Sequence, residues 1–443
     1  MPYQGGNRLP AEKASKLGHL DVIRSPLVQQ LCKNFNDPNC CLPVSSKILW
    51  QDLPNSGSEA NIIFSTDGSL QVIENSQPPH KAIAFVKTVL FKIDQHAISK
   101  LDRETPNPFA IRDLMSDSAL FHATAFPLRH AVIPGKTIYH AVREIIYESI
   151  KDKGLNDAID GAIMETLKWL VYEKWNPTPK TQLEKFGCPH CKENVATLQF
   201  DEEKGKCPRC NGEIYITDMF GLHLNMQDDF APNQVASDYM SVNETLMIFT
   251  PIRYFWETNK DVLKNCLMIK DGPLSLRATL AKLAAPIRRF FRFAKESEVE
   301  IAMIGQEKSG MFYDHLQLIG NTAPNYSIFI PNNEYIRSEI QHSNSIGIYG
   351  QDTNYGAKVF IKYNDYHKMV INIPTGEKGE FVNNPSSANL IAFERIIATL
   401  PKILSNRYEG ALFPIELANG VASLSTYPSA KVLKLFSKDA IEK

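Results

Sequence analysis

The chain has 443 residues, of which 43% are hydrophobic and 22% charged, and its formal net charge at pH 7 is -1. This is the composition of an ordinary globular protein, long enough for a sizeable core and for two or three domain-sized units. A net charge so close to zero excludes nucleic-acid binding through overall charge, so any such contact must come from a local basic patch.

The N-terminal residues and the cysteines indicate where the protein works. Residues 1–17 lack the apolar core of a signal peptide, and no apolar run approaches the length that spans a membrane. Four of the eight cysteines fall into two Cys-x-x-Cys pairs. Without a signal peptide, this pattern indicates metal binding in a reducing compartment rather than disulfides. We therefore expect a cytoplasmic protein that does not associate with a membrane.

Residues 1–50 are expected to form an N-terminal extension ahead of a main domain of residues 51–443. The extension mixes polar turns with one short amphipathic stretch, Pro26–Cys32. The adjacent Cys40 and Cys41 have no second pair at metal-ligand spacing, so we interpret them as structural residues.

The main domain opens with a β pattern. An apolar run at 61–66 ends at Asp67, which is followed by glycine, and further runs follow at 70–73 and 81–93. The polar linker 74–80 suits a hairpin. Three successive strands of this kind predict an antiparallel start to a sheet and not a strand–helix–strand unit.

Helical and strand patterns alternate through the rest of the domain. Helices are predicted within 108–175, most clearly at Thr137–Lys151 and Leu155–Trp175, then from near Ser241, over Leu276–Lys295 and finally over Asn389–Leu404. A strand is predicted at Val299–Gly305, a loop at 340–358, and a hairpin that joins Ala357–Tyr363 to Met369–Ile373. His367 lies near the tip of that hairpin, and we assign it a turn role.

The two cysteine pairs predict a zinc ribbon. Cys188 and Cys191 form the first pair, Cys207 and Cys210 the second, and the charged stretch between them suits a hairpin. Four thiolates at this spacing close a tetrahedral site, and a closed four-sulfur site is structural. We therefore predict that residues 183–217 form an inserted ribbon that binds one structural Zn²⁺. A redox role is less consistent with two copies that flank a polar hairpin.

The stretch Cys266–Leu274 carries the strongest sign of catalytic chemistry. A short apolar run ends at Asp271 and is followed by Gly272, which is the pattern of a buried strand with an acid at its exposed end. Asp67 and Gly68 repeat this pattern, so the two carboxylates are expected at one edge of a sheet. Carboxylate oxygens are the ligands that Mg²⁺ and Mn²⁺ prefer. The alternative is that Asp-Gly is a common turn pair without chemistry.

A third acid for such a site has two candidates in the preceding helix. A helix that starts near Ser241 and packs antiparallel to the following strand places Glu244 near Asp271. Glu257 lies about 20 Å further along the helix, so the geometry favours Glu244. However, Ser241-x-x-Glu244 is also a capping box, and a purely structural role for Glu244 is supported about equally well.

Basic residues follow Asp271 in two places. The predicted helix 276–295 carries basic side chains among three phenylalanines: Arg277, Lys282, Arg288, Arg289, Arg292 and Lys295, with Phe290, Phe291 and Phe293. This pattern suits phosphate contact, and it suits a solvated helix face above an aromatic core stripe equally well. After the next strand, Lys308 lies in a loop, where it is either a phosphate-binding lysine or an ordinary surface residue.

The order of these motifs resembles that of a known nuclease family. The motifs are Asp67-Gly68-Ser69, Glu244, Asp271-Gly272-Pro273-Leu274 and Lys308-Ser309. From about Ala60 to the C-terminus, the chain resembles the NurA family of DNA-end-processing nucleases. The resemblance implies an α/β fold with a ribonuclease-H-like (PIWI-like) mixed sheet and flanking helices. Relative to the minimal family pattern, the zinc ribbon is an insertion. It also implies a homodimer that works with a HerA-type hexameric ATPase in DNA end processing and repair, or in anti-phage (antiviral) defence.

The resemblance further implies the roles of the site residues. Asp67, Glu244 and Asp271 match the family's metal-binding acids, and Lys308 matches its lysine after a later strand. The implied activity is hydrolysis of DNA phosphodiester bonds, in which two Mn²⁺ or Mg²⁺ ions held by the three acids activate water and stabilise the leaving oxygen. Lys308 would pair with the scissile or an adjacent phosphate.

The late part of the chain departs from the family. The family's last motif has a tyrosine followed by an Ala-His pair, whereas the comparable stretch here has Ala411 and then Ala418-Asn419. Asparagine offers a metal one oxygen but does not titrate near neutral pH. Two hypotheses follow from this difference. The chain is either an active metal-dependent DNA nuclease or a catalytically weakened DNA-binding or adaptor subunit of the same ATPase complex.

Overall fold

The computed structural model describes residues 22–34, 49–54, 57–75, 78–96, 119–131, 133–152, 162–344, 346–376, 383–426 and 428–442. The chain divides into two compact units, Met1–Leu49 and Trp50–Lys443. In the first unit, the amphipathic stretch lies in helix α3 (Pro26–Asn34), none of whose residues is buried. The structural role predicted for Cys40 and Cys41 concerns residues outside the described ranges.

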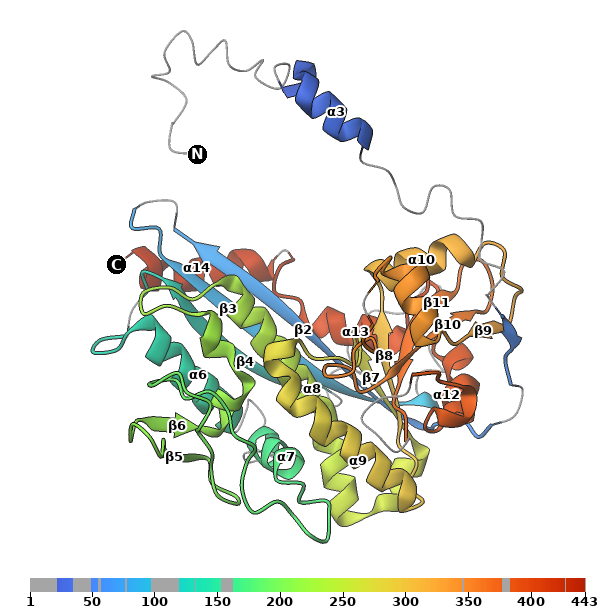
Figure 1. Cartoon of the computed structure of the whole chain (residues 1–443), viewed down its shortest axis with the longest axis horizontal. Coiled ribbons are helices and arrows are strands. Elements are labelled where there is room, and N and C mark those ends of the chain that lie inside the picture. Colours follow the sequence, from blue (N-terminus) through green and yellow to red (C-terminus); the bar gives the residue numbers. More distant parts are fainter. Residues whose placement is uncertain are drawn as a thin grey trace. The chain divides into compact units, whose positions relative to one another are not determined.

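The second unit is built on a large mixed sheet (Figure 1). In sheet order, the described strands are β1 (Gln51–Asp52), β9 (Ser327–Phe329), β10 (Ala357–Lys362), β11 (Lys368–Ile373), β8 (Ala302–Glu307), β7 (Cys266–Asp271), β2 (Ile62–Glu74), β3 (Ala82–Asp94) and β4 (Ala119–Arg129). β7 runs parallel to β2 and to β8, and every other neighbouring pair is antiparallel. With helices on its faces, this sheet confirms the predicted α/β class.

The antiparallel start of the sheet is confirmed, but β2 does not end at Asp67. The strand runs unbroken from Ile62 to Glu74 and pairs with β3 along its whole length, with Asp67 opposite Val89. The predicted break after Asp67 is wrong because this long cross-strand ladder outweighs the turn preference of one Asp-Gly pair.

Strand β4 contradicts the helical structure predicted across 108–175. Residues Ala119–Arg129 pair with β3 at the edge of the sheet. The segment is rich in alanine, but pairing with β3 decides its conformation. Pro127 also fits an edge strand, whereas a helix interior would lose a hydrogen bond there.

The two helices predicted before the cysteines are found with different extents. α6 (Ile138–Lys151) confirms the first prediction. α7 (Ala162–Val171) ends earlier than predicted, because Glu173 adopts a left-handed backbone conformation with φ of 53°. Residues 155–161 of the second predicted helix lie outside the described ranges.

Helix α8 (Asn233–Thr258) begins well before Ser241, so the predicted start is wrong. Side chains are buried along most of its length, and the residue pattern therefore carries no clear sign of where the helix begins. Ser241 lies in the helix interior, where its carbonyl oxygen accepts a hydrogen bond from Thr245 Oγ1 at 2.9 Å. The predicted capping box of Ser241 and Glu244 does not form.

The later predictions are confirmed in type and corrected in extent. The helix predicted over 276–295 is divided into the 3-10 helix η5 (Ala278–Leu283) and α9 (Ala284–Glu296). The predicted strand at 299–305 is β8, and the predicted hairpin is β10 with β11. His367 takes a turn role, with its backbone N–H donating to Asn364 Oδ1 at 2.8 Å.

The C-terminal part holds more helices than predicted. α12 (Phe393–Thr399), continued by η8 (Leu400–Lys402), is shorter than the predicted final helix, and α13 (Phe413–Ala422) and α14 (Ser429–Glu442) follow it. Other elements of the described ranges are η2 (Ile216–Phe220), η3 (Leu222–Asn225), η4 (Lys260–Asn265), α10 (Met311–Ile319), α11 (Asn333–Tyr335), the π-helix η6 (Ile336–Ile340) and η7 (Ser387–Asn389). Among the described helices, none is both long and apolar enough to cross a membrane.

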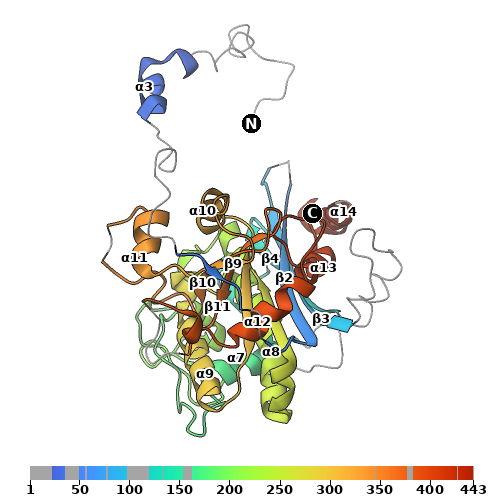
Figure 2. The ribbon, with the colours of Figure 1, turned by 90° about the vertical axis from the view of Figure 1, so that its right-hand side faces the viewer.

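Helices cover both faces of the sheet around β2 (Figures 1 and 2). α8 lies along β2 and β3 on one face, and α13 lies along the same strands on the other. Successive residues of β2 show the two faces, because side chains alternate along a strand. Ser65 Oγ donates to the carbonyl oxygen of Pro414 in α13 at 2.9 Å, whereas Gly68 faces Met240 and Glu244 of α8. Asp67 and Asp271 therefore lie in the sheet, the middle of three layers, and Glu244 lies in the helical layer above it.

Candidate active site

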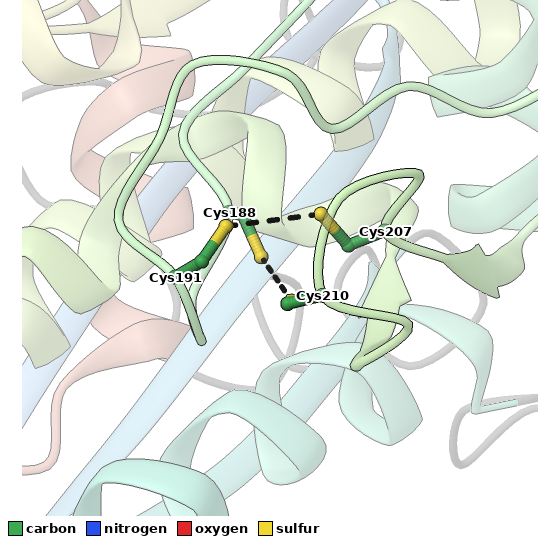
Figure 3. A group of neighbouring side chains, drawn as sticks. All are labelled: Cys188, Cys191, Cys207 and Cys210. Carbon is green, nitrogen blue, oxygen red and sulfur yellow. Dashed lines mark hydrogen bonds between the residues drawn. The ribbon is translucent and has the colours of Figure 1, made fainter.

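The four paired cysteines converge into one group, which we call the cysteine cluster (Figure 3). Cys207 and Cys210 lie in the turn between β5 (Lys204–Lys206) and β6 (Glu213–Tyr215). All four sulfur atoms lie within 4.8 Å of one another, with 3.7 Å between Cys188 and Cys210 and 3.9 Å between Cys191 and Cys207. Four sulfurs at about 2.3 Å from a tetrahedral Zn²⁺ are about 3.8 Å apart. The predicted metal group is thus confirmed as one that fits an ion such as zinc.

Backbone groups prepare one of these thiols for ionisation. Burial of Cys207 opposes the charged form, but the backbone N–H groups of Cys210 and Arg209 donate to the sulfur, and together with the neighbouring thiols they lower its pKa to about 7. Burial raises the pKa of Cys188 to about 12. Since only thiolates bind metal, we expect Cys207 to ionise first and the other thiols to lose their protons as the metal binds.

The ribbon is part of the main core and does not stand apart from it. Phe186 is buried in the same hydrophobic core as the residues of α6 and α8. The Tyr139 hydroxyl of α6 donates to the carbonyl oxygen of Pro189 at 2.8 Å. Arg143 of α6 donates two hydrogen bonds, of 2.9 and 2.8 Å, to the buried carboxylate of Asp218 just beyond the ribbon. Loosening the cysteine cluster should therefore disturb the core as well.

A second group lies at the end of the parallel pairing between β2 and β7, and we call it the acid site. It comprises Asp67, Glu244 and Asp271 with Lys270 and Lys308. The last paired residues of the two strands are Thr66 and Lys270, so Asp67 and Asp271 occupy the next positions, side by side. β7 ends at Asp271 and Gly272 turns away with φ of 80°, while β2 continues. The strand register therefore places Asp67 and Asp271 next to each other, but Asp67 lies within β2 and not at the predicted edge of the sheet.

Glu244 reaches the acid site from α8. A Cβ atom at Gly68 would lie only 2.5 Å from Glu244 Oε1, so the glycine leaves room for the Glu244 side chain in its present place. Glu244 Oε2 accepts a hydrogen bond from Lys270 Nζ at 3.0 Å, and both side chains are buried. The alternative acid, Glu257, lies near the exposed C-terminal end of α8, where it pairs with Arg253 at 3.0 Å. Glu257 is not at the acid site.

The two lysines hold two of the three acids. Lys270 Nζ also donates to the carbonyl oxygen of Asp271 at 2.8 Å. Lys308, from the loop after β8, pairs with Asp271 Oδ1 at 2.9 Å and remains more exposed than Lys270. Among the described residues, only the cysteine cluster gathers three or more metal-ligand atoms within 4.8 Å. The three acids do not gather as closely as the cysteines because Lys270 and Lys308 hold Glu244 and Asp271 in ion pairs.

Asp67 is the acid without a cationic partner in contact. Burial, followed by the nearby charge of Asp271, raises the pKa of Asp67 to about 7, although Lys308 and a hydrogen bond from Asn419 work in the opposite direction. Asp67 Oδ1 accepts from the backbone N–H of Gly68 at 2.7 Å, while the buried Oδ2 has no hydrogen-bond partner. A divalent cation would relieve both the repulsion and the unsatisfied oxygen.

Burial also shifts the pKa values of Glu244 and Lys270, the buried ion pair of the acid site. It raises the pKa of Glu244 even with Lys270 beside it. Burial works against the charged form of Lys270, but the Glu244 carboxylate outweighs it and raises the pKa of Lys270. Lys270 therefore stays protonated.

Asn419 lies at the acid site, at the exposed end of α13. Its side chain lies near the carboxylate of Asp67 and lowers the pKa of that acid. The residue that stands where the NurA family would have histidine thus contacts the most perturbed acid.

Two site residues escaped the sequence analysis. Lys270 is a charged residue within the otherwise apolar run of β7, and a buried lysine in such a strand is a signal that could have been used. Gln306 of β8 lies opposite Asp271 in the sheet and donates through Nε2 to the carbonyl oxygen of Gly410 at 2.6 Å. No local sequence pattern marks Gln306, because its place depends on strand pairing.

The helix 276–295 mainly serves the core. Phe290 and Phe291 are buried, and their rings contact those of Trp169, Trp175, Phe249 and Trp256. Arg288 donates to the carbonyl oxygens of Gln351 and Asn354, and Arg289 pairs with Glu173 at 2.7 Å. These contacts support the aromatic core stripe and leave Arg288 and Arg289 engaged within the protein.

Comparison with known proteins adds no relative from which a function could be transferred. No family model matches the sequence, and no curated protein matches it. The functional interpretation therefore rests on the residues and the geometry of the acid site and the cysteine cluster.

Proposed function

We propose that the chain is a metal-dependent deoxyribonuclease of the NurA type, which hydrolyses DNA phosphodiester bonds at the acid site with Mn²⁺ or Mg²⁺. The observation that carries this proposal is the side-by-side placement of Asp67 and Asp271. Asp67 keeps a buried carboxylate oxygen without a hydrogen-bond partner, and Lys308 stands next to Asp271. Two carboxylates and a partly exposed lysine are the groups that bind a cation and a phosphate.

The arrangement of the strands also supports the proposal. The strands around the acid site follow the order β4-β3-β2-β7-β8, and β3 alone runs antiparallel to the other four. This mixed arrangement supports the ribonuclease-H-like core that the resemblance implies. It places acids on neighbouring parallel strands, with Asp67 on β2 and Asp271 on β7.

The residues have distinct tasks in the proposed reaction. Asp67 and Asp271 would hold a divalent cation, which when bound acts as a Lewis acid on water and on the phosphate. Water adds to phosphorus, the bond to the leaving oxygen breaks, and the products are a phosphate monoester and a hydroxyl end. Lys308 would orient the anionic phosphate, and Asn419 would favour the charged form of Asp67. Glu244, the third acid of the resemblance, is bound to Lys270.

A second candidate function is a DNA-binding or adaptor subunit with weakened catalysis. The observation that favours it is Asn419, which contacts Asp67 but does not titrate as histidine would. In either case we propose a homodimer that works with a HerA-type hexameric ATPase in DNA end processing or anti-phage defence.

Cleavage of linear DNA distinguishes the two candidates. Zinc-loaded protein is incubated with linear DNA and Mn²⁺, with and without the ATPase. We expect Asp67→Asn and Asp271→Asn to lower cleavage at least about a hundredfold, the loss seen when a key transition-state stabiliser is removed. Glu257→Gln is the matched control, since that acid lies away from the site. A wild type that binds DNA but does not cut it would favour the adaptor, and full cleavage by both Asn variants would refute the nuclease.

A further inference from the structure

We propose that Lys270 is a built-in cation of the acid site: its ammonium group takes the place of a second divalent ion, so the site binds a single one. This inference rests on the proposed function and refines it. Two-metal nuclease sites hold their ions about 3.5–4 Å apart between shared carboxylates. Here the ammonium group of Lys270 lies between Glu244 and the end of β7 at Asp271.

The contacts of Lys270 are those of a cation held by the site. Its Nζ lies 3.0 Å from Glu244 Oε2 and 2.8 Å from the carbonyl oxygen of Asp271. The side chains of Lys270 and Glu244 are only 4% and 8% exposed. Nζ also lies 3.9 Å from the place of a Cβ at Gly272, so it is folded back beneath the turn that ends β7.

A second divalent ion at Glu244 would have to displace this ammonium group. The other oxygen, Oε1, lies against Gly68 of β2, only 2.5 Å from the place of a Cβ at that position. An ion that took Oε2 would leave Lys270 charged and buried without its carboxylate, which is strongly unfavourable. Glu244 therefore stays paired with Lys270 and does not bind the divalent ion. Asp67 can bind it, because its buried Oδ2 has no hydrogen-bond partner.

The charges of the acid site agree with one bound ion. Its three carboxylates exceed its two ammonium groups by one negative charge. One divalent ion turns this into a single positive charge, which suits an anionic phosphate. A second divalent ion would raise the net charge of the acid site to three positive charges, which repel one another.

Counting bound ions tests the proposal without relying on activity. Mn²⁺ is titrated into zinc-loaded protein and counted by calorimetry and by the spin-resonance signal of free Mn²⁺. We expect about one Mn²⁺ per wild-type chain and none in the variant that carries both Asp67→Asn and Asp271→Asn. Lys270→Met, which keeps the length and removes the charge, should bind about two. Two ions on the wild type, or one on a folded Lys270→Met, would overturn the proposal.

A double variant covers the case in which Lys270→Met does not fold. Lys270→Met with Glu244→Gln removes both charges of the buried pair and leaves no charge uncompensated. It should fold and bind one Mn²⁺ with an affinity within about threefold of the wild type, because Glu244 is not a ligand of that ion. Weakening by tenfold or more would show Glu244 to be a ligand and would overturn the proposal. If the wild type and the double Asp→Asn variant bind Mn²⁺ equally, the nuclease proposal itself fails.

Discussion

The four ligands of the cysteine cluster come from two turns within 22 residues of one another. The acid site instead joins β2, α8, β7 and the loop after β8, and Asn419 of α13 lies beside it. The sulfur atoms of the cluster lie at the spacing of a tetrahedral ion. In the acid site, lysines compensate Glu244 and Asp271, and one acid, Asp67, lacks a cationic contact. A metal ion bound at the cluster would therefore stabilise it, while the acid site is largely held by its own ion pairs. Metal should matter for folding at the first site and for chemistry at the second.

The largest stability effect is expected at the cysteine cluster. Cys207→Ser removes one thiolate of a buried metal group, so stability should fall by about 5 kcal/mol and the melting temperature by about 6 °C. Elemental analysis should find about one zinc per wild-type chain and much less in the variant. Cys32→Ser is the control, since Cys32 is exposed in α3 and should change neither quantity. Absence of zinc from protein kept in reductant would contradict the cluster's metal role.

The acid site should make stability depend on pH when Mn²⁺ and Mg²⁺ are left out. The pKa of Asp67 rises from its ordinary 3.8 to about 7 on folding, so the folded state holds its proton more tightly than the unfolded state. This contribution is favourable below about pH 4 and is lost as pH rises to about 7, an effect of up to about 4 kcal/mol.

The measurement is the difference in free energy of unfolding between zinc-loaded wild type and Asp67→Asn at several pH values. Taking the difference removes the pH dependence of the cysteine cluster, which both proteins share. Relative to Asp67→Asn, the wild type should lose stability as pH rises from about 4 to 7, and Mn²⁺ should restore it. A difference in stability that does not change between about pH 4 and 7 would show that folding does not raise the pKa of Asp67.

Substitution of Asn419 tests whether this asparagine weakens catalysis at the acid site. Asn419 is exposed at the end of α13, so histidine should fit there with a change in stability below about 1 kcal/mol. Asn419→His should preserve Mn²⁺-dependent cleavage or raise it by up to about tenfold near neutral pH, because histidine adds a titrating group beside Asp67. Asn419→Ala serves as the control for the lost hydrogen bond. A folded His variant that cuts much more slowly than the Ala variant would contradict this role.

The smallest effect is expected at Glu257. Its pair with Arg253 is exposed and links positions four residues apart on a helix, where such a pair contributes about 0.3–0.5 kcal/mol. Glu257→Gln should therefore change stability by no more than that and leave Mn²⁺ binding unaltered. Loss of Mn²⁺ binding in this variant would mean that the third acid has been misassigned.

Local sequence determined those parts of the molecule in which neighbouring residues complete a structure. The two Cys-x-x-Cys turns, helix α6, the end of β7 at Asp271 and the β10–β11 hairpin were all predictable from spacing and periodicity. Each depends on contacts within a short stretch of chain, so the pattern that forms the structure is visible in one window. The same holds for Glu244, whose preference over Glu257 followed from helix geometry although the start of α8 was wrong.

Tertiary structure decided what depends on pairing between distant segments. β2 continues through Asp67 because its ladder to β3 outweighs a local turn preference, and β4 is a strand because β3 offers it an edge. The register between β2 and β7 sets Asp67 beside Asp271, and packing of α8 and α13 brings Lys270 to Glu244 and Asn419 to Asp67. Charge and burial act through space and not along the chain. The electrostatic state of the acid site therefore follows only from the folded structure.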